Sequence, residues 1–529
     1  MIGVEFLYEM KRIFRNNIFR LFILFSVVGV ITMQYTWINL TMLHLPHIRL
    51  YDCWIPWSYK GLPFAMPFMN AFLFNFVQVV FVIFICSNDL CVRSRETVEA
   101  LYVRPVSNVK IVMGRNAGKL VAVTLLNFLS MGGALFFNIL YSGYAFNGSL
   151  YLFYWLTLTF PTLVFILGLS NWLGQVVKHQ GLFILLVLSI VGAGILFLAT
   201  RLEGFLDPFA REIPNVFSDI TGHAGIVNYL LQRITIFLIG IVFIFLTVGF
   251  YPRLDNSVNT RKKTGVLVGG LLLVLMIPVV TFINRHDARW EQQAFCKSLQ
   301  DRYGGVLVDH VVSQRIVLQE ETHGFHAESW MRITRLTSSD SSLVLFLNPG
   351  LEVDALEQDG IPVTYSRTGQ VLVTDLHLVE KDTVNLHVTY HGHIDGSVVC
   401  SDLPRESRGR ELSKRLGTRT VLDLENYKSY SPASLWYPTC VIPSTSFLQV
   451  KDFTCYSLTV RHREGATVIS QGIPEELKND ETIFHHAHAL PGINLCIGNY
   501  NCRTIRVDSI RYNVYYFPGH EYFFERFGK

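Results

Sequence analysis

One run near the end of the printed sequence begins like the metal site of a zinc peptidase. In that motif, His-Glu-x-x-His, two histidines lie one helical turn apart and share the metal ion, while the glutamate activates water. Here His520 and Glu521 are followed by Phe524 at the position of the second histidine. The run therefore lacks a ligand, and we expect no zinc-dependent hydrolysis from it.

A second run imitates a phosphate-binding loop. Residues 114–120, GRNAGKL, have one residue too few between the glycines, and Leu120 stands where a serine or threonine would reach the metal ion. The run also opens an apolar segment instead of following a strand. We therefore expect this chain to bind no cofactor of its own, so that ATP and Mg²⁺ belong to a separate subunit.

Two further groups of residues leave alternatives open. His485, His486 and His488 could bind a transition metal, but a solvated loop is favoured because no cysteine or carboxylate lies at ligand spacing. The six cysteines after residue 284 permit disulfides, for example between Cys496 and Cys502, or free buried thiols. We predict no metal site from either group.

Long apolar segments must position these residues. Half of the 529 residues are apolar and only 16% are charged, and the apolar excess lies almost entirely before residue 284. A helix of ~20 apolar residues crosses a bilayer. We predict an α-helical polytopic membrane domain over residues 1–283, with about seven spans at residues 18–41, 64–87, 120–142, 151–174, 182–199, 234–251 and 264–283.

The distribution of positive charge orients these spans. Short loops rich in lysine and arginine stay on the cytoplasmic side of a membrane. The loops on one side carry 15 such residues and the loops on the other side carry five. This places the amino terminus in the cytoplasm and residues 284–529 outside. Because the positive residues are spread over membrane-flanking loops, the net charge of +4 does not predict nucleic-acid binding.

The spans as drawn contain no ionisable residue in their interior. Transporters driven by ions need such residues at membrane depth, so any driving energy is expected from the cytoplasmic side. Residues 1–20 combine apolar side chains at helical spacing with basic residues, which predicts an amphipathic helix on the membrane surface. A cleaved signal peptide is the alternative, and it is disfavoured because the apolar run continues to about Met42.

The membrane domain resembles the permease subunits of type 2 ABC exporters. The resemblance rests on the amphipathic start, on Asp89 after the second span, and on residues 95–101 (RETVEAL), 104–107 (RPVS) and 109–115. In that family this polar stretch carries a short coupling helix that docks on the ATPase, which implies a coupling segment at residues 88–116. The residues implied in docking are Arg95, Glu96, Glu99, Arg104 and Pro105.

The residue types of this segment agree with short helices. Glu96 and Glu99 near a helix start favour its dipole, and Pro105 with Ser107 can end one helix and cap the next. The resemblance implies a separate ATPase, pairing with itself or with a similar permease, and a bacterial cytoplasmic membrane. One departure is that the family core has six spans, whereas here a seventh precedes a large outer domain.

The residues from 284 on have the pattern of a sheet. Short runs at 343–347, 371–376, 384–390 and 453–460 alternate apolar and polar residues and are bounded by turn residues. This predicts a mainly β extracytoplasmic domain over residues 284–529, either a sandwich or an open barrel.

This outer domain resembles the amino-terminal β-domain of aminopeptidase-N-like zinc peptidases. The resemblance rests on residues 348–353 (NPGLEV), on Asp359-Gly360, on residues 384–390 with Gly392, and on residues 436–438 (WYP). A generic sandwich of unrelated origin is the alternative. Because the zinc motif is incomplete, we expect the catalytic domain of that family to be absent.

These expectations combine into one functional hypothesis. The chain is expected to be the permease subunit of an ATP-driven exporter, a transport subunit and not an enzyme, whose cargo and direction of transport the sequence does not give. The alternative hypothesis is a membrane-anchored scaffold, in which the spans move nothing and the outer domain presents substrates to an extracytoplasmic zinc peptidase.

Overall fold

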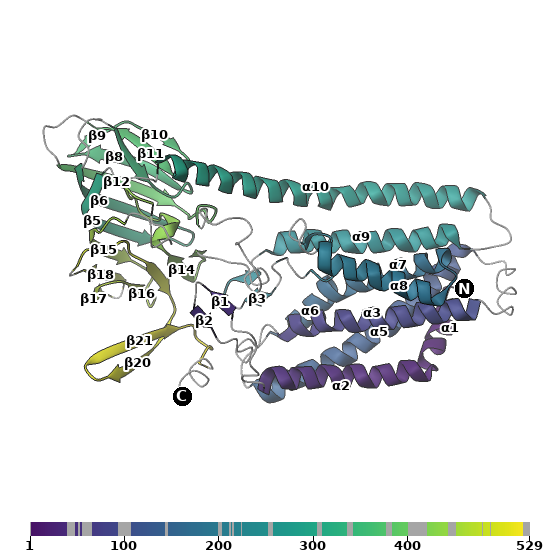
Figure 1. Ribbon diagram of the computed structural model, residues 1–529. Helices are drawn as coiled ribbons and strands as arrows, with labels where there is room; N and C mark the ends of the chain where they lie inside the picture. Colours follow the sequence, from purple (N-terminus) through teal and green to yellow (C-terminus); the bar gives the residue numbers. More distant parts are fainter. Residues whose placement is uncertain are drawn as a thin grey trace. The chain divides into compact units, whose positions relative to one another are not determined.

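The structure, a computed structural model, divides into two compact units, and each is described by itself (Figure 1). The helical unit covers the described residues up to 284, and the sheet unit covers those from 285 on. The structure describes residues 2–39, 48–50, 53–55, 66–93, 107–142, 147–198, 204–210, 213, 216–218, 220–223, 225–251, 258–303, 309–335, 342–376, 383–399, 421–442, 451–478, 480–486 and 488–521.

The helical unit is a bundle of long helices with a short amphipathic helix at its start (Figure 1). Its α-helices are α1 (Ile2–Phe14), α2 (Asn17–Asn39), α3 (Met66–Arg93), α5 (Asn108–Phe137), α6 (Ser149–Tyr154), α7 (Phe160–Val176), α8 (Gln180–Ala193), α9 (Ile226–Phe250) and α10 (Val258–Tyr303). Three π-helical turns interrupt or end them, η4 (Asn138–Ser142), η5 (Trp155–Thr159) and η6 (Gly194–Leu198). The short strands β1 (Ile48–Leu50), β2 (Cys53–Ile55), β3 (Phe217–Ser218) and β4 (Gly222–His223) form two pairs.

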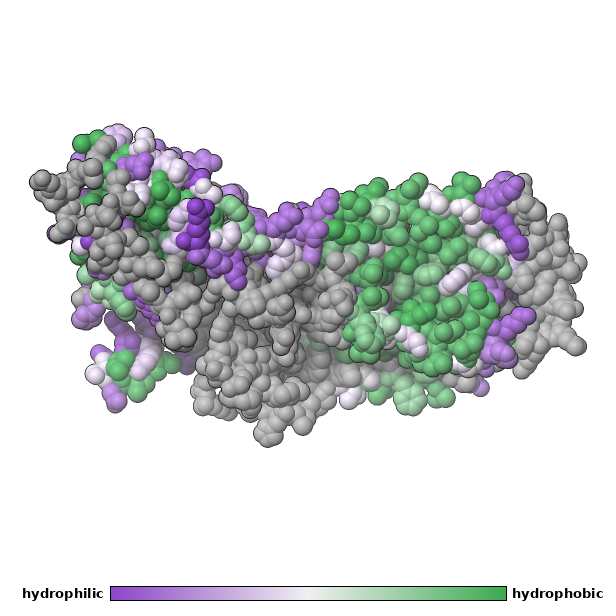
Figure 2. Space-filling view, turned by 45° about the horizontal axis from the view of Figure 1, so that its top comes forward, coloured by the Kyte–Doolittle hydropathy of each residue, from purple (hydrophilic) through white to green (hydrophobic). Residues whose placement is uncertain are grey.

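Six of the described helical segments are long and apolar enough to cross a membrane. They are Met66–Cys91, Asn108–Leu140, Ser149–Val176, Gln180–Leu198, Ile226–Phe250 and Arg261–Tyr303. The first predicted span falls in α2, which contributes the shorter apolar segment Phe19–Gly29. The visible face of the helical unit is hydrophobic over most of its length (Figure 2). An apolar outer surface of this kind is typical of a membrane protein.

The helices begin earlier than the sequence predicts, and this changes where the ionisable residues lie. The third predicted span begins at residue 120, but α5 begins at Asn108 and contains Arg115 and Lys119. The sixth predicted span begins at residue 234, but α9 begins at Ile226 and contains Arg233. Lys119 and Arg233 are each only 2% exposed. The spans as drawn from the sequence exclude these residues, but the apolar helices that the structure describes extend further and contain Lys119 and Arg233.

Arg233 holds a buried loop against the helices. Its guanidinium group donates to the carbonyl oxygens of Asp207 at 3.1 Å and Pro208 at 2.9 Å, and to Thr162 Oγ1 at 3.1 Å. The loop, residues 204–210, begins and ends with left-handed backbone at Gly204 and Ala210. Phe205, Asp207 and Phe209 within the loop are buried. A buried carbonyl needs a donor, and Arg233 shares this role with Gln232, which donates to Asp207, and Thr162, which donates to Pro208.

Replacing Arg233 is expected to destabilise the helical unit. Arg233→Met keeps much of the side-chain volume but removes the hydrogen bonds of a buried charged donor, whose loss typically costs about 1.5–3 kcal/mol. The carbonyl of Asp207 keeps Gln232 Nε2 and the N–H of Ala210 as donors, and that of Pro208 keeps Thr162 Oγ1. Thermal unfolding of the detergent-solubilised chain measures this as a lower midpoint. Arg261→Met, at an exposed position of α10, is the matched control. Equal midpoints for the two variants would contradict the role given to Arg233.

Two glycines let α7 and α9 touch. A Cβ atom on Gly168 would lie 2.4 Å from the carbonyl oxygen of Gly240, and one on Gly240 would lie 2.7 Å from the Cα atom of Phe165. No real side chain fits at either distance, so both positions require glycine. Small residues at helix crossings allow this close approach in apolar surroundings.

The sheet unit contains several β-sheets. An eight-stranded sheet has the order β17-β18-β15-β5-β6-β12-β8-β9, antiparallel throughout except between β15 and β5. Its strands are β5 (Asp309–Glu320), β6 (Phe325–Arg335), β8 (Leu351–Gln358), β9 (Ile361–Pro362), β12 (Thr383–Gly392), β15 (Cys455–Arg461), β17 (Ile473–Lys478) and β18 (Glu481–His485). The four runs of alternating residues predicted to be strands fall on β7 (Ser342–Phe346), β11 (Val371–Asp375), β12 and β15, which confirms that prediction.

Smaller sheets complete the unit. They are β10-β11-β7, made of β10 (Tyr365–Thr368), β11 (Val371–Asp375) and β7 (Ser342–Phe346), and β13-β14-β19-β16, made of β13 (Leu422–Asp423), β14 (Tyr427–Tyr430), β19 (Leu495–Gly498) and β16 (Thr467–Ser470). The three sheets share one buried core that includes Ile316, Leu345, Tyr390, Trp436 and Leu495. A separate hairpin consists of β20 (Asn501–Val507) and β21 (Ile510–Tyr516).

Candidate functional site

The five residues predicted to dock an ATPase lie outside the described part of the chain. They are Arg95, Glu96, Glu99, Arg104 and Pro105, within residues 94–106. The structure instead describes the two helices on either side of them. α3 ends at Arg93, and Ser107, in extended backbone, precedes α5.

A cluster of buried charges joins α1 to these two helices. The charge cluster consists of Glu5, Glu9 and Arg12 from α1, Asp89 from α3, and Arg115 and Lys119 from α5. Arg12 contacts both Glu9 and Asp89. Lys119 Nζ lies 2.6 Å from Asp89 Oδ2, and Arg115 Nε lies 3.6 Å from a Glu5 oxygen. Three carboxylates thus meet three cations, and their formal charges cancel.

Amide side chains extend the cluster to α7. Lys119 Nζ donates to Asn171 Oδ1 at 2.8 Å, and Asn171 Nδ2 donates to Asn116 Oδ1 at 2.6 Å. A second amide, Gln180 at the start of α8, donates to Ser87 Oγ of α3 at 2.6 Å. Buried charges are stable when they are paired and their donors are bonded, and the contacts of Lys119 provide both. Arg115 Nε and Asn116 Nδ2 are buried without a hydrogen-bond partner among the described residues.

The run that imitates a phosphate-binding loop has a different role in the structure. Residues 114–120 lie inside α5, so the run forms no loop. A Cβ atom on Gly118 would lie 2.8 Å from Glu9 Cβ and 3.1 Å from the carbonyl oxygen of Phe6. Gly118 therefore lets α1 approach α5 closely, and the lysine that follows it pairs with Asp89. This is a packing site for α1, with its cation held inside the protein.

The charge cluster can transmit force between helices. Ion pairs held away from water fix the relative positions of the helices that carry them, because separating the partners exposes unpaired charges.

The sequence analysis missed the charge cluster, although one signal was present. Glu5, Glu9 and Arg12 recur at spacings of four and three, which places them on one face of α1.

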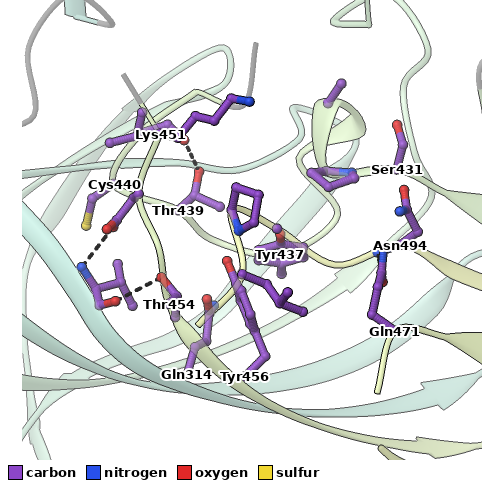
Figure 3. Close-up of a pocket in the computed structure, with 18 residues that line it drawn as sticks. Gln314, Ser431, Tyr437, Thr439, Cys440, Lys451, Thr454, Tyr456, Gln471 and Asn494 are labelled. Carbon is purple, nitrogen blue, oxygen red and sulfur yellow. Dashed lines mark hydrogen bonds between the residues drawn. The ribbon is translucent and has the colours of Figure 1, made fainter. Parts of the chain in front are cut away.

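The sheet unit contains a second candidate site, a cavity of about 490 Å³. The cavity is lined by residues of β5, by residues within 431–441, 451–456 and 490–494, and by Gln471 (Figure 3). Tyr437 and Tyr456 stand side by side in it, with their ring centres 5.7 Å apart. Gly492 has a φ of +153°, and a Cβ atom there would lie 2.8 Å from Pro432 Cγ. The size of the cavity suits a small ligand.

The cavity walls are held by hydrogen bonds within the protein. Gln314 Nε2 donates to Ser329 Oγ and to the carbonyl oxygen of Pro438, both at 2.9 Å. Asp452 Oδ2 accepts from the backbone N–H of Val311 at 2.9 Å. Burial raises the pKa of the Cys440 thiol well above its usual value, so this cysteine stays protonated and is a poor nucleophile. The cavity therefore offers hydroxyl and amide groups beside two aromatic rings.

The histidines and cysteines singled out in the sequence lie apart from both sites or on their margins. His520 and Glu521 lie in a turn beside Gly519, whereas a His-Glu-x-x-His site needs a helix. His485 is the last residue of β18. Within the described ranges, none of His485, His486 and His488 belongs to a group of three residues that could hold a metal ion.

The disulfide suggested between Cys496 and Cys502 is not formed. Both cysteines are free, and Cys496 Sγ lies 3.4 Å from Ser429 Oγ. The other interpretation, free thiols, describes this pair correctly, although Cys502 is exposed and not buried.

Comparisons with known proteins give similar solved structures only. No family model matches the chain, and no curated protein is similar to it. The M1 zinc metallopeptidase from Deinococcus radiodurans is 17% identical over 40% of this chain and 47% of its own, with a TM-score of 0.30. A mutant of it bound to a Tyr-Ser-Ala substrate is 16% identical over 40% and 47%, with a TM-score of 0.31. Leukotriene A4 hydrolase from Saccharomyces cerevisiae is 13% identical over 37% and 30%, with a TM-score of 0.27.

These similar structures correct one prediction from the sequence. They are zinc metallopeptidases and a hydrolase, and so they contradict the expectation that the chain is not an enzyme. The chain spans about half the length of the Deinococcus metallopeptidase and about a third of the yeast hydrolase.

Proposed function

We propose that the helical unit is the membrane subunit of an ATP-driven exporter of the type 2 ABC class. A separate ATPase docks on residues 88–116 from the cytoplasmic side and holds the ATP and Mg²⁺. The permease pairs with itself or with a similar subunit, and residues 284–529 are extracytoplasmic. The charge cluster is the observation that carries this proposal.

The charge cluster connects both ends of the docking segment to α1. The segment leaves α3 four residues after Asp89, which pairs with Arg12 of α1, and returns as α5. In α5, Arg115 pairs with Glu5 of α1 and Lys119 pairs with Asp89. A push on the segment therefore moves α1, α3 and α5 together, and the amides of Asn116 and Asn171 pass the movement to α7. ATP-driven closure of the ATPases would then bias the bundle between two states.

Co-purification tests the proposal. The intact chain is purified by an affinity tag in mild detergent, its companions are identified, and the ATPase activity of the complex is measured. We expect an ATP-binding subunit, lost on Glu99→Lys combined with Arg104→Glu because the charges of the docking face are reversed. Arg261→Glu, at an exposed position of α10, is the control and is expected to retain the subunit.

One outcome would favour the alternative. Recovery of a peptidase and no ATPase, in several detergents, would contradict the exporter and support a membrane-anchored scaffold. The orientation is tested separately in intact cells, where protease is expected to reach the sheet unit from outside and to leave α1 uncut. Cleavage of α1 from outside would reverse the proposed topology.

A further inference from the structure

The β20–β21 hairpin stands apart from the other sheets of its unit. It forms a two-stranded sheet by itself, and nearly every residue of both strands is exposed. An isolated hairpin is marginally stable in water at best. Another surface is therefore needed to cover it.

One face of the hairpin is apolar next to the turn, and Arg503, paired with Val514, and Asn501 lie on the same face further from the turn. The register pairs Ile505 with Tyr512 and Val507 with Ile510, and Val514 lies on the same face one pair further from the turn. Because side chains alternate along a strand, these five form a continuous patch. Each is 40–55% exposed. Such a patch on a water-soluble surface marks a binding site.

The opposite face carries two neighbouring positive charges. Arg506 and Arg511 face each other directly across the two strands. Like charges in this position repel and destabilise a hairpin. Neither forms an ion pair with a carboxylate in the part of the chain that the structure describes. The occupant of this hairpin must therefore bring negative charge as well as apolar area.

We propose that the β20–β21 hairpin lies flat in the interfacial layer of an anionic membrane. Its apolar face enters the acyl boundary by ~5–10 Å, as amphipathic surface elements do. Because the hairpin is about 10 Å thick, the opposite face then lies among the lipid phosphates, where Arg506 and Arg511 bind. Tyr512 lies on the apolar face and Tyr515 on the opposite face, and both suit the interfacial region, since tyrosine is enriched at membrane interfaces. The polar turn Asp508-Ser509 stays at headgroup level.

A lipid surface explains both faces better than a second copy of the chain does. Two hairpins joined through their apolar faces would leave the opposed arginines of each copy turned outward and still repelling one another. Anionic phosphates neutralise both, at about 1 kcal/mol for each arginine. The apolar helices of the same chain also keep a bilayer at high effective concentration.

Hydrogen–deuterium exchange of the full chain in lipid nanodiscs tests this. One copy is placed in each disc, with either phosphatidylglycerol added or phosphatidylcholine alone. We expect the amides of residues 501–516 to exchange more slowly in both discs than in detergent. They should be slowest in the anionic discs, by roughly 30-fold, the factor equivalent to two arginines at an anionic surface.

Matched variants separate the two faces. Arg506→Gln with Arg511→Gln is expected to remove the difference between the discs, and Ile505→Ser with Tyr512→Ser to remove the protection in both. Arg332→Gln, on an exposed position of β6, is the charge control and is expected to change neither. Unchanged exchange of β6 and β12 confirms that each variant folds.

Three outcomes would overturn the inference. Equal exchange in anionic discs, neutral discs and detergent would show that lipid does not cover the hairpin. Protection that appears only when two copies share a disc would assign the surface to a second copy. Protection that is already complete in detergent would assign it to another part of the same chain. The exporter proposal is untouched by any of these, because its test is the recovery of an ATPase.

Discussion

Asp89→Asn is expected to destabilise the helical unit strongly. The asparagine is nearly isosteric, but it leaves Lys119 without its carboxylate and Arg12 with Glu9 alone. Breaking a buried ion pair by removing one partner costs about 3–5 kcal/mol, because the remaining charge stays buried and unpaired. Thermal unfolding of the detergent-solubilised chain measures the loss, and fluorescence-detected size-exclusion chromatography follows the fraction that remains monodisperse.

Glu9→Gln is the matched control for this prediction. Glu9 is more deeply buried than Asp89, because its exposed fraction is 1% and that of Asp89 is 8%. Its loss nevertheless leaves Arg12 and Lys119 both paired with Asp89, so we expect a smaller fall in the unfolding midpoint. If Glu9→Gln destabilised the chain as much as Asp89→Asn, Asp89 would not be the centre of the cluster.

Gly240→Leu is expected to prevent α7 and α9 from packing. The nearest atoms to a new Cβ are backbone atoms of Val164 and Phe165, at 2.7 Å, and backbone cannot move aside without shifting the whole helix. Overpacking usually costs 1–3 kcal/mol, and a clash with backbone places this variant at about 3 kcal/mol or more. The expected result is an aggregated or absent peak in size-exclusion chromatography after extraction.

Gly132→Leu provides the comparison. Gly132 also lies within a long apolar helix, α5, but no atom lies within 4 Å of the position of its Cβ. Leucine there should change stability by no more than about 0.5 kcal/mol, as for other open positions. A monodisperse Gly240→Leu protein with a wild-type unfolding midpoint would show that the two helices can separate without loss of the fold.

Much of the architecture can be predicted from the periodicity of apolar residues, but the starts of the helices cannot. The alternation in residues 384–390 predicts β12, because one face of that strand is buried and the other is not. The helix starts were harder to predict, since hydropathy detects apolar side chains and not hydrogen-bonded backbone. Lys119 and Arg233 therefore appeared to end the spans, although each lies inside a helix and is neutralised or bonded by distant residues.

The charge cluster was harder to predict from the sequence than the strands, for a physical reason. Asp89 and Lys119 are thirty residues apart, and nothing local in either sequence says that they meet. Gly118 was interpreted through its resemblance to a phosphate loop, but its neighbours in space are Glu9 and Phe6. The docking residues Arg95, Glu96, Glu99, Arg104 and Pro105 remain predictions from the resemblance, because they lie outside the described ranges.

The equal numbers of positive and negative charges in the cluster have an electrical consequence. Moving one elementary charge across a membrane potential changes the free energy by about 2.3 kcal/mol for each 100 mV. The three carboxylates and three cations of the cluster carry no net formal charge when they move together. A displacement of α1, α3 and α5 as one body would therefore be neither driven nor opposed by membrane voltage, and a working stroke through this cluster would cost the same in an energised and a de-energised cell.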